Sequence, residues 1–251
     1  MMGSNSPFME SLASRVLEWH LNHLVQLKRS PTDVAILLRL RKDESIFVSQ
    51  KVKLLKLYTE LFYPPPLSKA PFLHAVAMGF GGEAEFAPFL FKFAVLNSGH
   101  VQAEEWLNTL FIKWHYDGRT FEEAFELLKV KEVGPAIFSS RYLTLLGQYR
   151  DDSARHTGGQ EVRTLCSLLK PEFGGDAKLA VLVYEARHTT EAANVRQGVL
   201  FDLFTEWVEK EAKQRDFRSK LFSEMANINE EDSKAIKSAF NIFRKGKRVA
   251  D

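Results

Sequence analysis

Hydrophobic residues recur along this chain at intervals of three and four positions, the spacing that places side chains on one face of an α-helix. Leu17, Leu21, Leu24 and Leu27 show this spacing near the N-terminus. No stretch alternates hydrophobic and polar residues for long, and no Asn-Gly pair marks a hairpin. The pattern therefore predicts an all-α chain.

Residues at two helix boundaries agree with this prediction. Ser30 can cap a helix whose first position is Pro31, and Asp33 favours the positive end of the helix dipole. A further helix is expected from about residue 49 to residue 61. It ends at Tyr63-Pro64-Pro65-Pro66, because prolines remove amide donors and fix the backbone.

A segment containing two adjacent glycines occurs twice. Phe80-Gly81-Gly82-Glu83-Ala84 returns 93 residues later as Phe173-Gly174-Gly175-Asp176-Ala177. Glycine tolerates left-handed backbone geometry, so each pair is expected to end one helix and begin the next. A second set returns at the same offset: Leu107, Leu110, Phe111 and Trp114 correspond to Leu200, Leu203, Phe204 and Trp207. Two matches at one offset indicate an internal repeat.

The first part of the chain also matches its middle. Residues 30–40 correspond to residues 120–130 at an offset of 90, and Tyr58 corresponds to Tyr149 at an offset of 91. Phe243 lies 94 residues after Tyr149 and stands at the expected tyrosine position. These offsets predict an elongated array of helical units. The expected boundaries are 8–63, 64–152 and 153–251, with a joint at Gly158-Gly159 and with residues 1–7 as a cloning remnant.

The middle unit resembles a known family. Trp114, Gly118-Arg119-Thr120, Leu127-Leu128-Lys129-Val130 and Tyr149 resemble the WY motif of RXLR effectors, which oomycete plant pathogens secrete and deliver into host cells. The preceding stretch, from Phe72 through Phe80-Gly81-Gly82 to Phe86, resembles the L motif that joins WY modules into LWY repeats. The resemblance implies one WY-like unit followed by two LWY-like units, the last of them degenerate at its C-terminal end.

In that family, each WY unit is a small helical bundle with Trp and Tyr packed in its core. The resemblance therefore assigns a structural core signature to Tyr58, Trp114, Tyr149, Trp207 and Phe243. It assigns the repeat turns to Phe80, Gly81, Gly82, Phe173, Gly174 and Gly175. The chain departs from the pattern in its first unit, where Leu24 stands at the tryptophan position, and it has no Arg-x-Leu-Arg leader motif.

The resemblance also implies a function. Effectors of this family are secreted by the pathogen, act in the host cytoplasm or nucleus, and bind host plant proteins to suppress immunity; no cofactor and no catalysis are implied. Some LWY arrays capture the core enzyme of protein phosphatase type 2A through its scaffold subunit, as regulatory subunits do, and two adjacent LWY-like units suit that mechanism. Other arrays bind trafficking or autophagy proteins. An enzyme with an unrecognised site and a self-associating scaffold are the alternatives from other classes, and we expect a monomer.

Composition narrows the classes of function. The formal net charge is +2, which disfavours a dedicated nucleic-acid binder. The single cysteine, Cys166, cannot form an internal disulfide and is expected to be buried and inert among leucines. No run approaches the roughly 18 apolar residues of a membrane span.

Residues that suggest chemistry have simpler structural explanations. His20 and His23 have a spacing that can bind metal, but no third ligand lies near them in the sequence. Glu122-Glu123 and Glu230-Glu231-Asp232 suit the first turns of helices better than acid–base catalysis. Gly79-Phe80-Gly81-Gly82 lacks the preceding strand and the following Lys of a phosphate-binding loop.

Two surface features have more than one interpretation. The basic cluster near the C-terminus is typical of a helix end, although it also suits phosphate contacts or a nuclear signal; it comprises Arg244, Lys245, Lys247 and Arg248. Trp19 lies off the leucine face of its helix. It is the candidate partner-binding residue, and packing against a neighbouring unit is an equal alternative.

Overall fold

The structure is a computed structural model that describes residues 19, 22–40, 42–65, 67–97, 99–156 and 163–250. These residues form helices joined by turns and contain no strand, which confirms the all-α prediction. Residues 1–7, Leu17, His20, Leu21 and Gly158-Gly159 lie outside the described residues. Within the described ranges, no helix combines the length and apolar character needed to cross a membrane.

The chain divides into two compact units. Unit 1 comprises Met1–Leu90 and Val101–Lys113, and unit 2 comprises Phe91–His100 and Trp114–Asp251. These bounds do not coincide with the three units expected from the sequence offsets. The three-unit division therefore remains a prediction.

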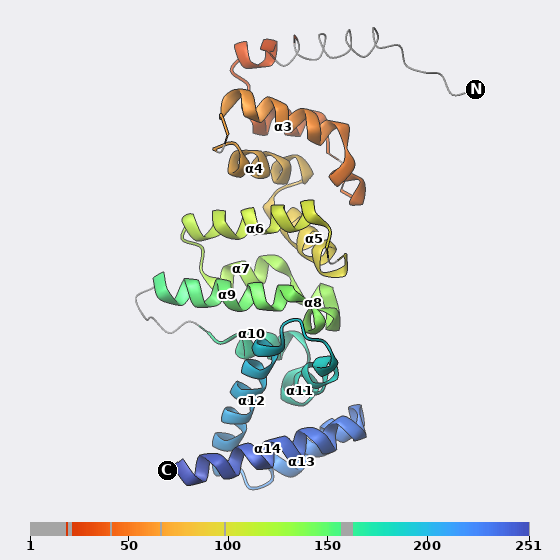
Figure 1. Ribbon diagram of the computed structural model, residues 1–251, viewed down its shortest axis with the longest axis vertical. Coiled ribbons are helices and arrows are strands. Elements are labelled where there is room, and N and C mark those ends of the chain that lie inside the picture. The colour runs from red at the N-terminus through yellow and green to blue at the C-terminus, as the bar shows by residue number, and fades with distance from the viewer. Residues whose placement is uncertain are drawn as a thin grey trace, which may run out of the picture. The chain divides into compact units, whose positions relative to one another are not determined.

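Unit 1 is built from short helices (Figure 1). It contains α2 (Pro31–Leu38), the 3-10 helix η1 (Glu44–Val48), α3 (Gln50–Phe62) and α4 (Lys69–Phe80), together with the first part of α5 (Glu83–Leu96) and most of α6 (Val101–Tyr116). The predicted stop before the prolines is confirmed, since α3 ends at Phe62 and Tyr63 adopts an extended conformation.

The start of α2 follows from its first residues. The Ser30 hydroxyl accepts a hydrogen bond from the backbone N–H of Asp33 at 3.1 Å, and the Asp33 carboxylate accepts one from the backbone N–H of Ser30 at 3.0 Å. Pro31 occupies the first helical position. The predicted cap is therefore confirmed, and two backbone donors that would lack partners are satisfied.

Helix α2 packs directly on α4. The crossing is closest at Gly79, because a Cβ atom built there would lie 2.8 Å from the carbonyl oxygen of Ala35 and 3.0 Å from its Cβ. Any side chain at Gly79 would push the two helices apart. Glycine is therefore required at this position for packing.

An aromatic cluster fills the core of unit 1. The centroid of the Trp106 ring lies 5.1 Å from that of Phe47, 5.9 Å from that of Phe72 and 6.1 Å from that of Phe86. Phe80 lies 5.4 Å from Phe86. All five side chains are buried. Aromatic pairs at these separations stabilise a core beyond the area that they bury, so η1, α4, α5 and α6 are held together by one cluster.

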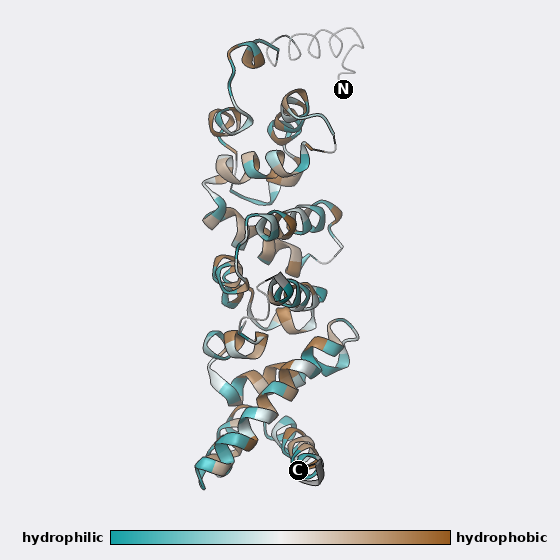
Figure 2. Cartoon of the chain, turned by 90° about the vertical axis from the view of Figure 1, so that its left-hand side faces the viewer, coloured by the Kyte–Doolittle hydropathy of each residue, from teal (hydrophilic) through white to brown (hydrophobic). Residues whose placement is uncertain are grey.

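Unit 2 contains the rest of α5 and α6 and the helices that follow (Figure 1). These are α7 (Phe121–Leu128), α8 (Val130–Val133), η2 (Gly134–Ser139), α9 (Arg141–His156), α10 (Leu165–Glu172), α11 (Gly175–Glu185), η3 (Ala186–His188), α12 (Ala193–Lys213), α13 (Phe217–Ile228) and α14 (Glu230–Ala250). Figure 2 shows hydrophobic and hydrophilic residues side by side on α14, the helix that ends at the C-terminus. Its Ile236 and Phe240 are buried while Lys234 and Lys237 are exposed, as expected for a helix with one face in a core.

A buried cation stabilises the start of α12. The Arg196 guanidinium donates hydrogen bonds to the backbone carbonyl oxygens of Phe138, at 2.8 Å, and of Thr189 and Glu191. The residue is 4% exposed, and burial lowers its pKa. Three carbonyl acceptors offset the loss of hydration, and together they attach α12 to η2.

The helix caps near Ser30 recur 90 residues later. Thr120 and Glu123 form a second capping box at the start of α7. Helices α2 and α7 both end at a residue in the left-handed conformation, Arg39 at φ 47° and Lys129 at φ 46°. The two segments that correspond in sequence thus share local backbone geometry.

A second local correspondence was missed in the sequence. Ile46-Phe47 in η1 and Ile137-Phe138 in η2 are both buried, and they lie 91 residues apart. The Ile-Phe identity at the offset that also relates Tyr58 to Tyr149 was the available signal.

Candidate functional site

Four of the five aromatic residues assigned to the core signature are buried. Trp114 and Trp207 are fully buried, as is Tyr58, and Tyr149 is 6% exposed. Side chains in these positions do not offer a surface to a partner. Their effect on function is through folding.

Both tyrosines hold the carbonyl group that precedes a helix cap. The Tyr58 hydroxyl donates to the backbone oxygen of Arg29 at 2.6 Å, and the Tyr149 hydroxyl donates to that of Arg119 at 3.0 Å. Burial raises the pKa of both hydroxyls, that of Tyr149 to about 12. The hydrogen bonds join α3 and α9 to the residues that precede the caps of α2 and α7.

The C-terminal end of unit 2 has a different arrangement. The ring of Phe240 is buried 5.5 Å from Trp207. Phe243, which the resemblance assigned to the core, is half-buried and lies 5.3 Å from Phe201 and 5.6 Å from Phe204. Phe243 also lines a shallow apolar groove between α12 and α14, and it has no hydroxyl to hold a carbonyl group. Sequence reasoning missed Phe240.

The two Phe-Gly-Gly segments form turns between consecutive helices. Gly81 and Gly82 have φ of 127° and 106°, and Gly174 and Gly175 have φ of 84° and 93°. Residues with side chains rarely adopt such values. Phe80 and Phe173 are buried beside the turns. The segments join α4 to α5 and α10 to α11.

The acid that follows each glycine pair is ion-paired. Glu83 lies 3.5 Å from Lys113 in unit 1, and Asp176 lies 2.5 Å from Lys210 in unit 2. These pairs are partly buried. They join α5 to α6 and α11 to α12, so these acids also have a structural explanation.

The other acidic groups singled out in the sequence have local partners. The Glu123 carboxylate accepts from the backbone N–H of Thr120 at 2.9 Å, and the Glu122 carboxylate accepts from the backbone N–H of Arg163 at 3.0 Å. Glu230 pairs with Lys234 at 2.7 Å. Glu123 thus caps α7, Glu230 pairs with a charge, and Glu122 holds the residue that precedes the cap of α10.

Metal and thiol chemistry find little support in the described ranges. No group of three or more His, Cys, Asp and Glu side chains is placed there to hold a metal ion. Cys166 is completely buried, and burial raises the pKa of its thiol to about 12. A thiol with such a pKa is protonated near neutral pH and is a poor nucleophile.

Trp19 is 64% exposed, and its ring stacks on that of His23 at 5.7 Å. An exposed indole can anchor a partner. This role for Trp19 remains a proposal. His20, the second histidine of the sequence pair, lies outside the described residues.

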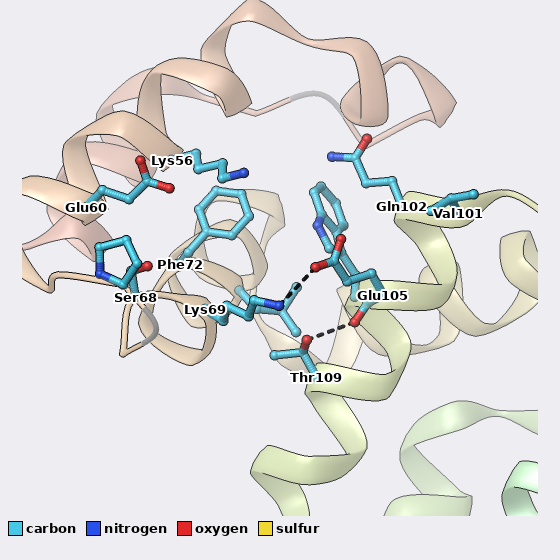
Figure 3. Close-up of a pocket in the computed structure, with 12 residues that line it drawn as sticks. Lys56, Glu60, Ser68, Lys69, Phe72, Val101, Gln102, Glu105 and Thr109 are labelled. Atoms are coloured by element: carbon cyan, nitrogen blue, oxygen red, sulfur yellow. Dashed lines mark hydrogen bonds and ion pairs between the residues drawn. The ribbon is translucent and has the colours of Figure 1, made fainter.

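A pocket in unit 1 offers a more enclosed site (Figure 3). It has a volume of about 400 Å³ and lies between the C-terminal half of α3, the start of α4 and the start of α6. Phe72, Leu73 and Trp106 supply apolar walls. The pocket is thus formed against the aromatic core of the unit.

Polar side chains surround this apolar surface. Lys56 and Glu60 come from α3, Lys69 from α4, and Gln102 and Glu105 from α6. Lys69 pairs with Glu105 at 3.3 Å. In Figure 3, Lys56 and Gln102 extend toward one another across the pocket. Sequence reasoning missed this site, because its residues come from three segments with no shared motif.

Comparison with known proteins identifies a solved structure of similar fold. No protein-family model and no curated protein matches the chain. The chain is similar to the crystal structure of PcRxLR12, an oomycete RXLR effector, with a TM-score of 0.54 and 19% sequence identity. The match covers 97% of this chain and 56% of PcRxLR12, so the chain spans about half the length of that protein. At this identity, the likeness shows a shared fold.

Proposed function

We propose that this protein is a pathogen effector that acts in a host cell by binding a host protein. The observation that carries the proposal is the likeness to PcRxLR12 along 97% of the chain. A likeness over nearly the whole chain indicates that the arrangement of helices is shared, although function itself is carried by sites on a fold. The resemblance to the WY and LWY motifs points to the same class of protein.

The proposed action is binding without turnover. Of the acids that sequence reasoning considered for catalysis, Glu123 caps a helix and Glu230 and Asp232 form ion pairs, and the buried thiol has a raised pKa. Unit 1 also offers a formed pocket with apolar walls and a polar rim, a composition typical of binding sites. These features suit a protein that recognises a partner through its surface.

A finer proposal concerns the partner. Following the resemblance to tandem LWY units, the host is a plant, the protein is secreted by the pathogen and delivered to the cytoplasm or nucleus, and the result is suppressed immunity. In its most specific form, the protein binds the scaffold subunit of protein phosphatase type 2A. The support for this form is the motif pattern of the second and third predicted units.

The test is an affinity purification from plant-cell extract with the intact chain as bait. The control bait carries Trp114→Ala and Trp207→Ala, which remove two fully buried side chains and are expected to unfold the protein. The effector proposal is supported if the intact bait, and not the control bait, retains a host protein in stoichiometric amount. The purified host protein must then bind the purified intact bait as well. The phosphatase scaffold and catalytic subunits together would support its specific form.

Two results would count against these proposals. A different plant protein retained in stoichiometric amount would overturn the phosphatase form while preserving the effector class. Retention of no host protein from extracts of susceptible plant tissue, with a correctly folded bait, would overturn binding as the mode of action.

A further inference from the structure

We propose that the pocket between α3, α4 and α6 is a docking site for a short peptide segment of a partner protein. The segment inserts one large, uncharged apolar side chain against Phe72 and Trp106, and its main chain binds the polar rim. This inference rests on the proposed function, because it assigns a contact site and a ligand chemistry to a binding protein.

The apolar walls belong to a packed aromatic core. The rings of Phe72 and Trp106 meet edge to face at 5.9 Å, and Trp106 is also held by Phe47 and Phe86 within the core. Phe72 is 8% exposed and Trp106 is 5% exposed, and both residues line the pocket. A preformed aromatic surface accepts an apolar side chain without having to be ordered first.

Three hydrogen-bonding groups at the pocket have no partner within the described part of the chain. They are the Lys56 ammonium, the Gln102 amide and the Ser68 hydroxyl. Ser68 is only 6% exposed, and although it precedes α4 its side chain makes no capping hydrogen bond. These groups open onto the pocket, where water or a ligand can supply their partner. A ligand that supplies an acceptor here would take the place of that water.

The charges of the rim favour an uncharged occupant. Lys56 and Lys69 are balanced by Glu60 and Glu105, and Lys69 and Glu105 already pair with each other. A ligand with a net charge of either sign would be attracted by one pair of side chains and repelled by the other. A peptide group carries both an acceptor and a donor, so its carbonyl suits Lys56 or Gln102 and its N–H suits Glu60.

The size of the pocket supports the same occupant. Its volume of about 400 Å³ lies in the lower part of the range of small-ligand pockets, which is about 300–1,000 Å³. It accommodates an apolar side chain together with adjoining main chain. The pocket therefore suits a peptide anchor better than it suits a metal ion or a single small anion.

The direct test uses capped tripeptides, acetyl-Ser-Xaa-Ser-amide, in which Xaa is Leu, Phe, Asp or Lys. The intact protein is titrated with each peptide while the indole N–H signals of its four tryptophans are followed by NMR. We expect the Leu and Phe peptides to shift the Trp106 signal in a saturable way and to leave those of Trp114 and Trp207 unchanged. Asp and Lys peptides are expected to bind at least about 10-fold more weakly, because burying an unpaired charge is unfavourable.

Matched variants separate the pocket from the rest of the surface. Lys56→Ala and Gln102→Ala are expected to weaken binding about 3- to 10-fold each, the usual effect of losing one hydrogen bond. Lys53→Ala and Asn108→Ala change exposed residues of the same two helices that do not line the pocket, and they are expected to have no effect. Val101→Trp adds a bulky ring at the rim from a residue that is 76% exposed, and it should block binding while the protein stays folded.

The inference is overturned if no peptide gives a saturable shift at Trp106, if the four peptides bind equally well, or if Val101→Trp binds like the unchanged protein. Its failure is distinguishable from failure of the proposed function. If the intact chain and Val101→Trp retain a host protein equally from the plant extract, the pocket is not its docking site, and the effector proposal still stands. If the intact chain retains none, the effector proposal fails, and the titration still reports on the pocket.

Discussion

Tyr149 in α9 donates a hydrogen bond from its hydroxyl to the backbone oxygen of Arg119, and the two oxygen atoms lie 3.0 Å apart. Tyr58 makes the same bond to Arg29. In both places the acceptor belongs to the residue just before a capping box. A helix start and the helix that packs beside it are thus fixed by one hydroxyl group.

Replacing this hydroxyl tests its contribution to the fold. Tyr149→Phe and Tyr58→Phe should each lower the free energy of unfolding by about 1–2 kcal/mol, because each leaves a carbonyl group without its donor. Urea denaturation followed by circular dichroism measures the change. The matched variant is Tyr116→Phe, since Tyr116 is 84% exposed and should tolerate the loss. An equal effect at all three positions would rule out the hydrogen bond as the cause.

Alkaline pH should weaken the same contact. The folded state raises the pKa of Tyr149 to about 12, against about 10 for an unperturbed tyrosine. The stability gained from the neutral hydroxyl is therefore fully present below pH 10, and it is lost as the pH rises from 10 through 12. Urea midpoints measured from pH 9 to pH 12 should fall more steeply for the unchanged protein than for Tyr149→Phe. Parallel curves would contradict this assignment.

Gly79→Ala should destabilise unit 1 by about 1–3 kcal/mol, because the added methyl group overlaps the backbone of Ala35. Gly198→Ala is the matched control, since it lies inside α12 with open space around it. That change should stabilise the protein by about 0.5–1 kcal/mol through the lower entropy of the unfolded chain. Thermal unfolding of both variants provides the comparison, and a stabilising Gly79→Ala would disprove the close crossing.

Arg196→Ala should lower the free energy of unfolding by about 2–4 kcal/mol, because it leaves the carbonyl groups of Phe138, Thr189 and Glu191 without a charged donor. Arg196→Lys should recover only part of the loss, since an ammonium group lacks the planar fork of a guanidinium. Lys213→Ala, an exposed change on the same helix, is the control in chemical denaturation. Full recovery by lysine would show that charge alone is sufficient.

Cys166 should resist thiol reagents while the protein is folded. Its side chain is completely buried, and the pKa of its thiol is raised to about 12. With a disulfide reagent at pH 8, we expect labelling at least about 100-fold slower than for a free thiol, because reaction waits for an opening of the structure. Urea should restore the normal rate. Rapid labelling of the native protein would show that the thiol is accessible.

Local signals allowed parts of this fold to be predicted from the sequence. The cap at Ser30 and the proline stop after Tyr63 depend on side chains that act on their own backbone, so a few adjacent residues define them. The choice between Phe240 and Phe243 depends on how α14 is rotated against α12. The two residues are three positions apart on one helix, and counting offsets cannot separate them.

The pocket was beyond prediction for a related reason. Lys56, Ser68, Gln102 and Trp106 come from three helices and share no spacing. Only the packing of α3, α4 and α6 brings them together. Trp106 gave no separate signal in the sequence, because an aromatic residue on a helix is usually part of a core.

The acceptors of Tyr58 and Tyr149 are main-chain oxygen atoms, and every amino acid supplies that atom. These two hydrogen bonds therefore do not depend on the side chains of Arg29 and Arg119, although the Arg119 guanidinium also lies over the ring of Trp114. A lineage under selection to alter its outward-facing residues can do so at position 29, which is exposed, without loss of this contact. The hydrogen bond thus requires that the tyrosine be conserved, whereas it places no requirement on the side chain of the residue that supplies the carbonyl group.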